Sequence, residues 1–157
     1  MKWELKQKGF TIVELLIVVV VIAILAAITI VSYNGITQQS RLSVMQSDIS
    51  AMNKAILMYH AKHGHYPYSG ATGANVTGPS INIPGLSEFL PNPPRIPDDG
   101  NSGYYAYIWS ANGADYKIIR LVPSGAMLPQ HERDLPNIDP QRTTRGWGIW
   151  SDGGRTI

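Results

Sequence analysis

One long apolar segment near the N-terminus constrains this chain more than any other feature. Residues 10–31 contain a single charged residue, Glu14, and Thr29 is the one polar residue between Leu15 and Val31. As a helix rising about 1.5 Å per residue, the segment spans roughly 33 Å, which matches the hydrocarbon core of a bilayer. We therefore expect a membrane-spanning helix, with the rest of the chain on one side of it.

The distribution of charge predicts which side that is. Residues 1–9 carry three lysines and one glutamate, a net charge of 3 − 1 = +2, and the remaining 10 basic and 10 acidic residues cancel. The positive-inside rule then predicts a cytoplasmic N-terminus, with the larger part of the chain outside. Because the body of the chain has no excess of Lys and Arg, no specific nucleic-acid partner is inferred.

Glu14 separates the possible readings of this segment. A secretory signal peptide has a shorter apolar region that ends in a small-x-small cleavage site, and a plain membrane anchor needs no carboxylate. A carboxylate in a membrane helix costs about 2–3 kcal/mol and usually has a partner, yet no cation stands three or four residues from Glu14. A cut after Gly9 would make Phe10 a free amine, four residues from Glu14.

The run Lys8-Gly-Phe-Thr-Ile-Val-Glu14 resembles the class III leader and cleavage site of type IV prepilins. The resemblance implies that a membrane peptidase cuts between Gly9 and Phe10 and methylates the new amino group of Phe10. It also implies that Glu14 is required for ordered assembly. Tyr33 matches an aromatic residue common in these proteins.

The apolar segment departs from the family pattern at one point. Many pilins have a proline about two-thirds along it, where the helix melts in the filament, whereas residues 27–31 contain none. Gly35 is the substitute candidate for local melting, because glycine has the most backbone freedom to lose in a helix.

Beyond residue 31 the pattern becomes amphipathic. Apolar or aromatic residues recur at alternating spacings of three and four, which predicts one stripe of a continuing helix: Leu42, Met45, Ile49, Met52, Ile56, Tyr59 and His63. A coiled-coil seam is the rival interpretation, but it needs a longer run with charged flanks. Gly64 followed by Pro67 predicts the end of the helix.

The rest of the chain predicts a small antiparallel sheet. Two runs, 103–109 and 115–121, flank the hairpin signal Asn112-Gly113, and residues 146–150 form a third strand candidate. Residues 68–85 and 123–145 are expected to be loops, with one helical turn at 86–90.

The expected fold class is α+β, with a long N-terminal helix on an antiparallel sheet, as in pilins. The expected regions are a cleaved leader (1–9), a transmembrane and filament-core helix (10–33), an amphipathic helix (34–63) and a β-sheet head (64–157).

Other candidate chemistry is weaker. His60 and His63 share a helix face, but His65 lies beyond the glycine, so we expect no metal site and no other cofactor. Residues 98–101 (Asp-Asp-Gly-Asn) offer calcium ligands without a calcium-loop spacing, and Asn75-Val76-Thr77 is a glycosylation triplet.

Because no phosphate loop, nucleophile elbow or pair of carboxylates appears, no catalytic residue is assigned and an enzyme is not expected. With no cysteine, the head must hold its C-terminal loop by packing and hydrogen bonds alone, and Trp147, Ile149 and Trp150 are its expected anchors.

The resemblance implies a structural subunit of a type IV pilus. The precursor would be a single-pass protein of the cytoplasmic membrane, and the mature chain would form a homopolymer at the cell surface that serves motility, adhesion or DNA uptake. Its partners would be a prepilin peptidase and methyltransferase and the pilus assembly machinery. The alternative within the family is a pseudopilin of a type II secretion or competence system. An alternative from another class is a monomeric, membrane-anchored binding protein.

Overall fold

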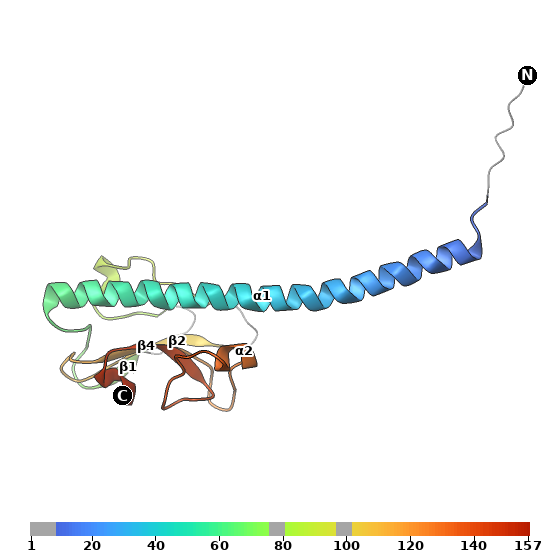
Figure 1. The fold of residues 1–157 in the computed structure, drawn as a ribbon. Coiled ribbons are helices and arrows are strands. Elements are labelled where there is room, and N and C mark those ends of the chain that lie inside the picture. Colours follow the sequence, from blue (N-terminus) through green and yellow to red (C-terminus); the bar gives the residue numbers. More distant parts are fainter. Residues whose placement is uncertain (1–8, 76–80, 97–101) are drawn as a thin grey trace, which may run out of the picture. The chain divides into compact units, whose positions relative to one another are not determined.

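The computed structural model describes residues 9–75, 81–96 and 102–157. It divides the chain into two compact units, Met1–Ser40 and Arg41–Ile157, which are considered separately below. One helix, α1 (Ile12–His63), runs through both units (Figure 1). The first unit contains α1 up to residue 40, and the second unit contains the rest of α1 and the sheet.

The helix ends where the sequence predicts. Gly64 has a φ of 78°, in the left-handed region, and its N–H donates to the carbonyl of His60 at 2.8 Å. This closes the last turn and satisfies one of the carbonyls that every helix C-terminus leaves free. Glycine is favoured here because a Cβ atom makes the left-handed conformation costly.

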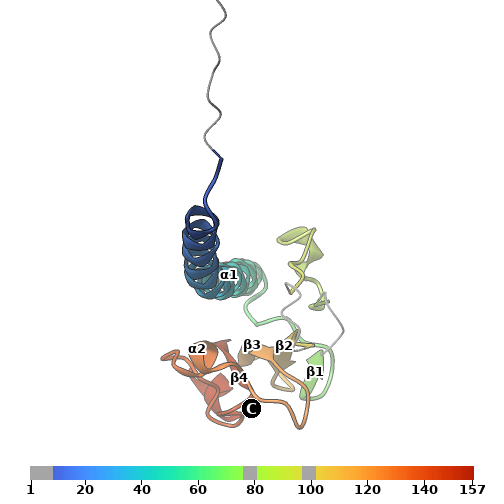
Figure 2. The same ribbon diagram turned by 90° about the vertical axis from the view of Figure 1, so that its right-hand side faces the viewer.

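Within the second unit, residues 41–63 of α1 lie along one face of the sheet (Figure 2). The predicted stripe forms the helix side of the core, and Ala55 joins it: the buried members are Leu42, Met45, Ile49, Met52, Ala55 and Ile56. Each large member contributes about 1.5–3 kcal/mol of hydrophobic stabilisation. The last two positions of the stripe differ, because Tyr59 is half-buried and His63 is exposed.

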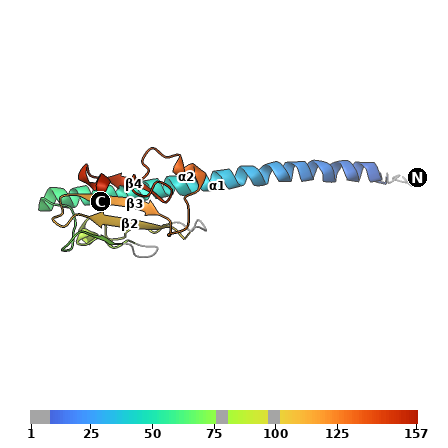
Figure 3. The same cartoon turned by 90° about the horizontal axis from the view of Figure 1, so that it is seen from below.

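The sheet has four antiparallel strands in the order β1-β2-β3-β4, so the expected α+β fold is confirmed. The strands are β1 (Gly73–Asn75), β2 (Tyr104–Trp109), β3 (Tyr116–Leu121) and β4 (Gly146–Trp150), the last three running side by side in Figure 3. The hairpin between β2 and β3 turns at Gly113, whose φ of 65° lies in the left-handed region. Glycine adopts this conformation with less strain than other residues. Tyrosines link sheet to helix: Tyr105 donates to Asp48 at 2.8 Å, and Tyr116 donates to Asn53.

The expected loop at 68–85 is partly wrong. Residues 73–75 form the edge strand β1, which pairs with β2, and Ile81 and Ile83 are buried in the core. The uncharged, glycine-rich composition concealed both features, since a three-residue edge strand leaves no periodic pattern. The predicted helical turn is present as the 3₁₀ helix η1 (Leu86–Glu88).

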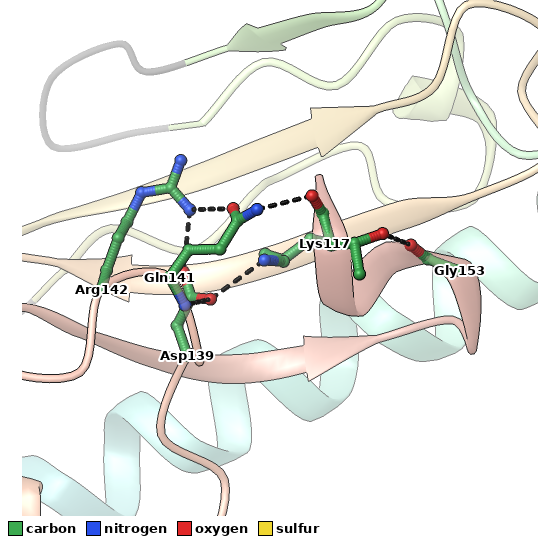
Figure 4. A network of polar contacts seen from close by, with 6 residues as sticks. Lys117, Asp139, Gln141, Arg142 and Gly153 are labelled. Carbon is green, nitrogen blue, oxygen red and sulfur yellow. Dashed lines mark hydrogen bonds and ion pairs between the residues drawn. The ribbon is translucent and has the colours of Figure 1, made fainter.

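The expected irregular connection at 123–145 contains a short helix, α2 (Gln130–Arg133), and carries two buried acidic residues. On the helix-facing side of the sheet, Glu132 accepts from the Trp147 indole at 2.7 Å and lies 3.6 Å from Arg120. On the opposite side, Asp139 pairs with Lys117 (Figure 4). Packing and hydrogen bonds alone were expected to hold this region, so the buried ion pairs are a correction to that expectation.

A second, smaller apolar cluster covers the sheet face that carries Lys117. It contains Ala106, Ile108, Ile119 and Leu121, with Tyr104, Trp150 and Ile157 packed against it. The C-terminal 3₁₀ helix η2 (Gly153–Thr156) is joined to this side by Gln141, whose amide donates to the carbonyl of Thr156 at 2.5 Å. Of the three expected anchors, Trp147 is buried in the main core, and Ile149 and Trp150 are half-buried against the two clusters.

Candidate processing and assembly site

Gly9 and Phe10 lie in irregular chain just before α1 begins at Ile12. The Phe10 side chain is 76% exposed. A Cβ atom added to Gly9 would meet nothing within 4 Å, and the Gly9 φ lies outside the left-handed region. The fold of the described chain therefore places no demand for glycine at position 9, and accessible backbone surrounds the junction.

Glu14 is held by Thr11 at the start of the helix. The Thr11 backbone N–H donates to Glu14 Oε2 at 2.8 Å, and the Thr11 hydroxyl donates to the same oxygen at 2.7 Å. The Glu14 N–H in turn donates to the Thr11 hydroxyl oxygen at 3.2 Å. This reciprocal arrangement is a capping box, which satisfies donors that a helix N-terminus otherwise leaves free.

The sequence interpretation missed this role of Thr11. It searched for a cation near Glu14, whereas the Thr-x-x-Glu spacing of a capping box was present and pointed to a local partner. In the described part of the chain no Lys, Arg or His forms an ion pair with Glu14. Among the residues that the structure describes, the carboxylate is thus hydrogen-bonded to Thr11 without a counter-charge.

The apolar residues that follow are uncovered. Every large hydrophobic residue from Ile12 to Ile30 is between 48% and 84% exposed. The helix is long and apolar enough to cross a membrane by length and composition, and none of its most apolar stretch is buried within the described chain. A contiguous apolar surface of this size requires lipid or other protein to cover it.

Comparison with protein families bears directly on this segment. Residues 5–30 match the family model of the prokaryotic N-terminal methylation motif. The match covers Gly9, Phe10, Thr11 and Glu14 together with most of the apolar segment.

Curated proteins agree with it. A type IV major pilin protein of Neisseria gonorrhoeae is 34% identical over 79 residues, which cover 50% of this chain and 47% of that pilin. About half of the chain is thus similar to type IV pilins. A type IV major fimbrial protein of Dichelobacter nodosus is 40% identical over 72 residues, or 45% of this chain and 46% of the fimbrial protein. This chain thus spans about half the length of the pilins it matches.

A different relative aligns over more of the chain. The type II secretion system core protein G of Escherichia coli K12 is 26% identical over 125 residues, covering 78% of this chain and 86% of that protein. No solved structure matches the chain. The likeness to pilins therefore rests on sequence.

The remaining sequence candidates lie elsewhere. Val76 and Thr77 of the glycosylation triplet and residues 98–101, the calcium candidate, fall outside the described residues. The three histidines at the end of α1 lie among aromatic rings: His60 stacks on Tyr66 and His63 stacks on Tyr59, each with ring centroids 4.3 Å apart. The described residues contain no group of three or more His, Cys, Asp or Glu side chains that could hold a metal ion.

Proposed function

We propose that this chain is a type IV pilin, made as a membrane-anchored prepilin and polymerised into a surface filament. A prepilin peptidase cuts between Gly9 and Phe10, and the new amino group of Phe10 is methylated. The regions are the leader at 1–9, the membrane and filament-core helix at 10–33, the amphipathic helix at 34–63 and the head at 64–157. The observation that carries the proposal is the glycine at position 9, placed before a capped helix whose large hydrophobic residues from Ile12 to Ile30 are exposed.

The glycine boundary supports processing because the fold has no use for that glycine. Gly9 has room for a side chain and an ordinary φ, so the fold does not require glycine there. We infer that recognition by another protein requires it. A peptidase that works at the membrane surface must bring its catalytic groups against the substrate backbone. A residue without a side chain permits that close approach.

The exposed apolar helix supports assembly. Before assembly the lipid bilayer covers this surface, and the basic leader holds the N-terminus on the cytoplasmic side. In the filament the same surfaces of neighbouring subunits cover one another, so the segment moves from one dry environment to another. The assembly machinery of the pilus drives that transfer. The chain acts as a structural subunit, and its function requires no catalytic residue.

Glu14 supports the register of that assembly. An unpaired carboxylate stays costly in a dry filament core, and the cationic amine of Phe10 on an incoming subunit supplies the counter-charge. N-methylation keeps that amine cationic. Apolar packing alone tolerates sliding between helices, whereas one axial offset places the amine beside Glu14.

Three variants separate charge pairing from helix capping. Glu14→Gln keeps an oxygen that can accept from Thr11 but removes the charge, and Thr11→Val removes the hydroxyl half of the capping box but keeps the charge. Glu14→Ala removes both. We expect the precursors of all three variants to insert into the membrane and to be cleaved. Glu14→Ala and Glu14→Gln should then yield no sheared surface filaments, whereas Thr11→Val should still form them. Filament loss in Thr11→Val with normal yield from Glu14→Gln would instead assign Glu14 a capping role.

N-terminal mass spectrometry of surface-sheared material tests the processing step. The expected N-terminus is methylated Phe10, and Gly9→Val should accumulate as uncut precursor in the membrane fraction. Gly35→Val, at another glycine with free space around it, serves as the control and should be cleaved normally. Surface material that begins at Met1 would contradict the proposal and favour a monomeric, membrane-anchored binding protein.

A pseudopilin is the second candidate, and the alignment with the secretion core protein favours it. That alignment covers 78% of this chain and 86% of the secretion protein, whereas the alignment with the gonococcal pilin covers 50% of this chain and 47% of the pilin. Electron microscopy of sheared cells distinguishes the two functions. Long surface filaments labelled by an antibody against the head support the pilin, and processed subunits confined to the cell envelope support the pseudopilin.

A further inference from the structure

We propose that His63 and His65 form a binding site for a late first-row divalent transition metal, with Cu²⁺ bound most tightly. The site lies where α1 ends in the second unit. It uses two imidazoles of one chain, with solvent molecules filling the remaining coordination positions. The proposal is independent of the pilin function.

The left-handed turn at Gly64 brings the two rings together. In the sequence, His65 seemed excluded from a shared site because it lies beyond the end of the helix. Instead, the Gly64 φ of 78° folds the chain back, and the ring centroids of His63 and His65 lie 6.1 Å apart. Metal–nitrogen bonds of about 2.0–2.1 Å hold two imidazole centroids roughly 4.5–6.4 Å apart in the usual geometries. The observed separation corresponds to a nitrogen–metal–nitrogen angle of about 145°, between the tetrahedral and linear arrangements, so a small rotation of the exposed His63 ring would bring the pair to a regular geometry.

A backbone hydrogen bond fixes the tautomer of His65. Its Nδ1 lies 3.0 Å from the carbonyl oxygen of Tyr66. Because a carbonyl only accepts, Nδ1 must carry the proton, and Nε2 of the neutral ring keeps its lone pair. Metal-binding histidines typically donate their second nitrogen to a carbonyl or carboxylate in this way, which orients the ring and raises its basicity.

Aromatic contacts hold both rings in place. His63 stacks on Tyr59, with a centroid distance of 4.3 Å, and His65 meets the same tyrosine edge-on at 5.7 Å. Tyr68 contacts His65 from another side, at 4.9 Å. A metal ion would therefore meet two oriented ligands, and binding would cost little side-chain entropy. His63 is exposed and His65 is half-buried, so the pair is open to solvent.

The metal class follows from the ligands. Imidazole nitrogens suit Cu²⁺, Ni²⁺ and Zn²⁺, and the general order of affinity places Cu²⁺ highest. The free carbonyls at the C-terminus of α1 add a favourable field for a cation. Hard ions such as Ca²⁺ and Mg²⁺ prefer oxygen ligands and should not compete.

Two other histidines provide matched controls. His60 lies one turn earlier on α1, and its ring stacks on Tyr66 at 4.3 Å. His131 belongs to α2, on a different element. Replacing either with Gln changes the histidine content by the same amount as replacing a proposed ligand.

The experiment titrates CuCl₂ into the full chain, purified without a histidine tag in detergent micelles at pH 7.5, and records the Cu²⁺ electron paramagnetic resonance spectrum. We expect hyperfine coupling to two imidazole nitrogens. His63→Gln and His65→Gln should each weaken binding at least about 10-fold, whereas His60→Gln and His131→Gln should leave it unchanged. Equal Cu²⁺ binding by the double variant His63→Gln/His65→Gln would show adventitious binding only and overturn the site.

Nuclear magnetic resonance of the unmodified chain gives a second test that requires no substitution. Substoichiometric Cu²⁺ should broaden the imidazole signals of His63 and His65 before those of His60 and His131. Simultaneous broadening of all four histidines would also overturn the proposal.

Discussion

The substitution Asp139→Asn should destabilise the head strongly, because Asp139 compensates a fully buried lysine. The Asp139 side chain is buried and accepts from Lys117 Nζ at 2.9 Å, from Arg142 Nη1 at 2.9 Å and from the backbone N–H of Gln141 at 3.1 Å. The network ties the connection between α2 and β4 to the beginning of β3, where Lys117 is the second residue (Figure 4). Asparagine has nearly the same shape but carries no charge.

The magnitude follows from burial. Lys117 and Asp139 both have 0% side-chain exposure, so the variant would leave an ammonium group out of water without its carboxylate. Breaking a buried ion pair by removing one partner costs about 3–5 kcal/mol, a large part of the 5–15 kcal/mol that stabilises a typical domain. The ion pair of Lys62 with Glu88 is the matched control, because its side chains are 51% and 57% exposed. Glu88→Gln should change the free energy of unfolding by less than about 1 kcal/mol.

Urea unfolding of the full chain in detergent, followed by tryptophan fluorescence, measures both effects. Trp147 and Trp150 lie on β4, next to the strand that carries Lys117, so their emission reports the opening of this region. We expect a large fall in the unfolding midpoint for Asp139→Asn with an unchanged slope. An Asp139→Asn midpoint equal to that of Glu88→Gln would refute the reasoning from burial.

The same carboxylate predicts acid sensitivity. Burial alone would raise the pKa of Asp139, but hydrogen bonds from Lys117, Arg142 and the Gln141 amide outweigh it and hold the pKa below its ordinary value. A carboxyl group whose pKa is lowered by folding contributes its full stabilisation above the unfolded pKa of about 3.9. That contribution disappears as the pH falls through the folded pKa. The unmodified head should therefore lose stability below about pH 4, and the Asp139→Asn variant should lose less over the same interval.

Three further outcomes can be checked by thermal unfolding of the head. Trp147→Ala should cost about 3–5 kcal/mol, since it leaves a cavity in the main core and removes the indole that donates to Glu132. Gly148→Ala should destabilise the sheet, because the new Cβ would lie 2.0 Å from the Ile118 carbonyl oxygen; Gly125→Ala, with nothing within 4 Å, should fold despite its positive φ. Dithiothreitol should leave the unfolding temperature unchanged, as the chain contains no cysteine.

Local and periodic features were predictable from the sequence. The end of α1 at Gly64, the stripe from Leu42 to Ile56 and the hairpin at Gly113 are each written in short-range patterns. Such patterns act within a few residues, where backbone geometry and one buried face decide the conformation. The motif at Gly9, Phe10 and Glu14 is also local.

Features that depend on distant partners were not predictable. The strand β1 exists only because β2 offers it an edge, and its three residues have no alternation of their own. Lys117 and Arg120 lie on opposite faces of β3, and both are buried because the connection at 123–145 supplies Asp139 and Glu132. A single sequence does not show which acidic residue will meet which basic one across a long connection.

The sequence by itself determined the membrane-length helix, the motif of Gly9, Phe10 and Glu14 and the resemblance to pilins, since each depends on residue types at fixed short spacings. The tertiary structure decided which charges are buried. The physical reason is the cost of burial. A charge is placed by the desolvation and hydrogen bonding of its whole surroundings, and those surroundings exist only once distant segments have packed together.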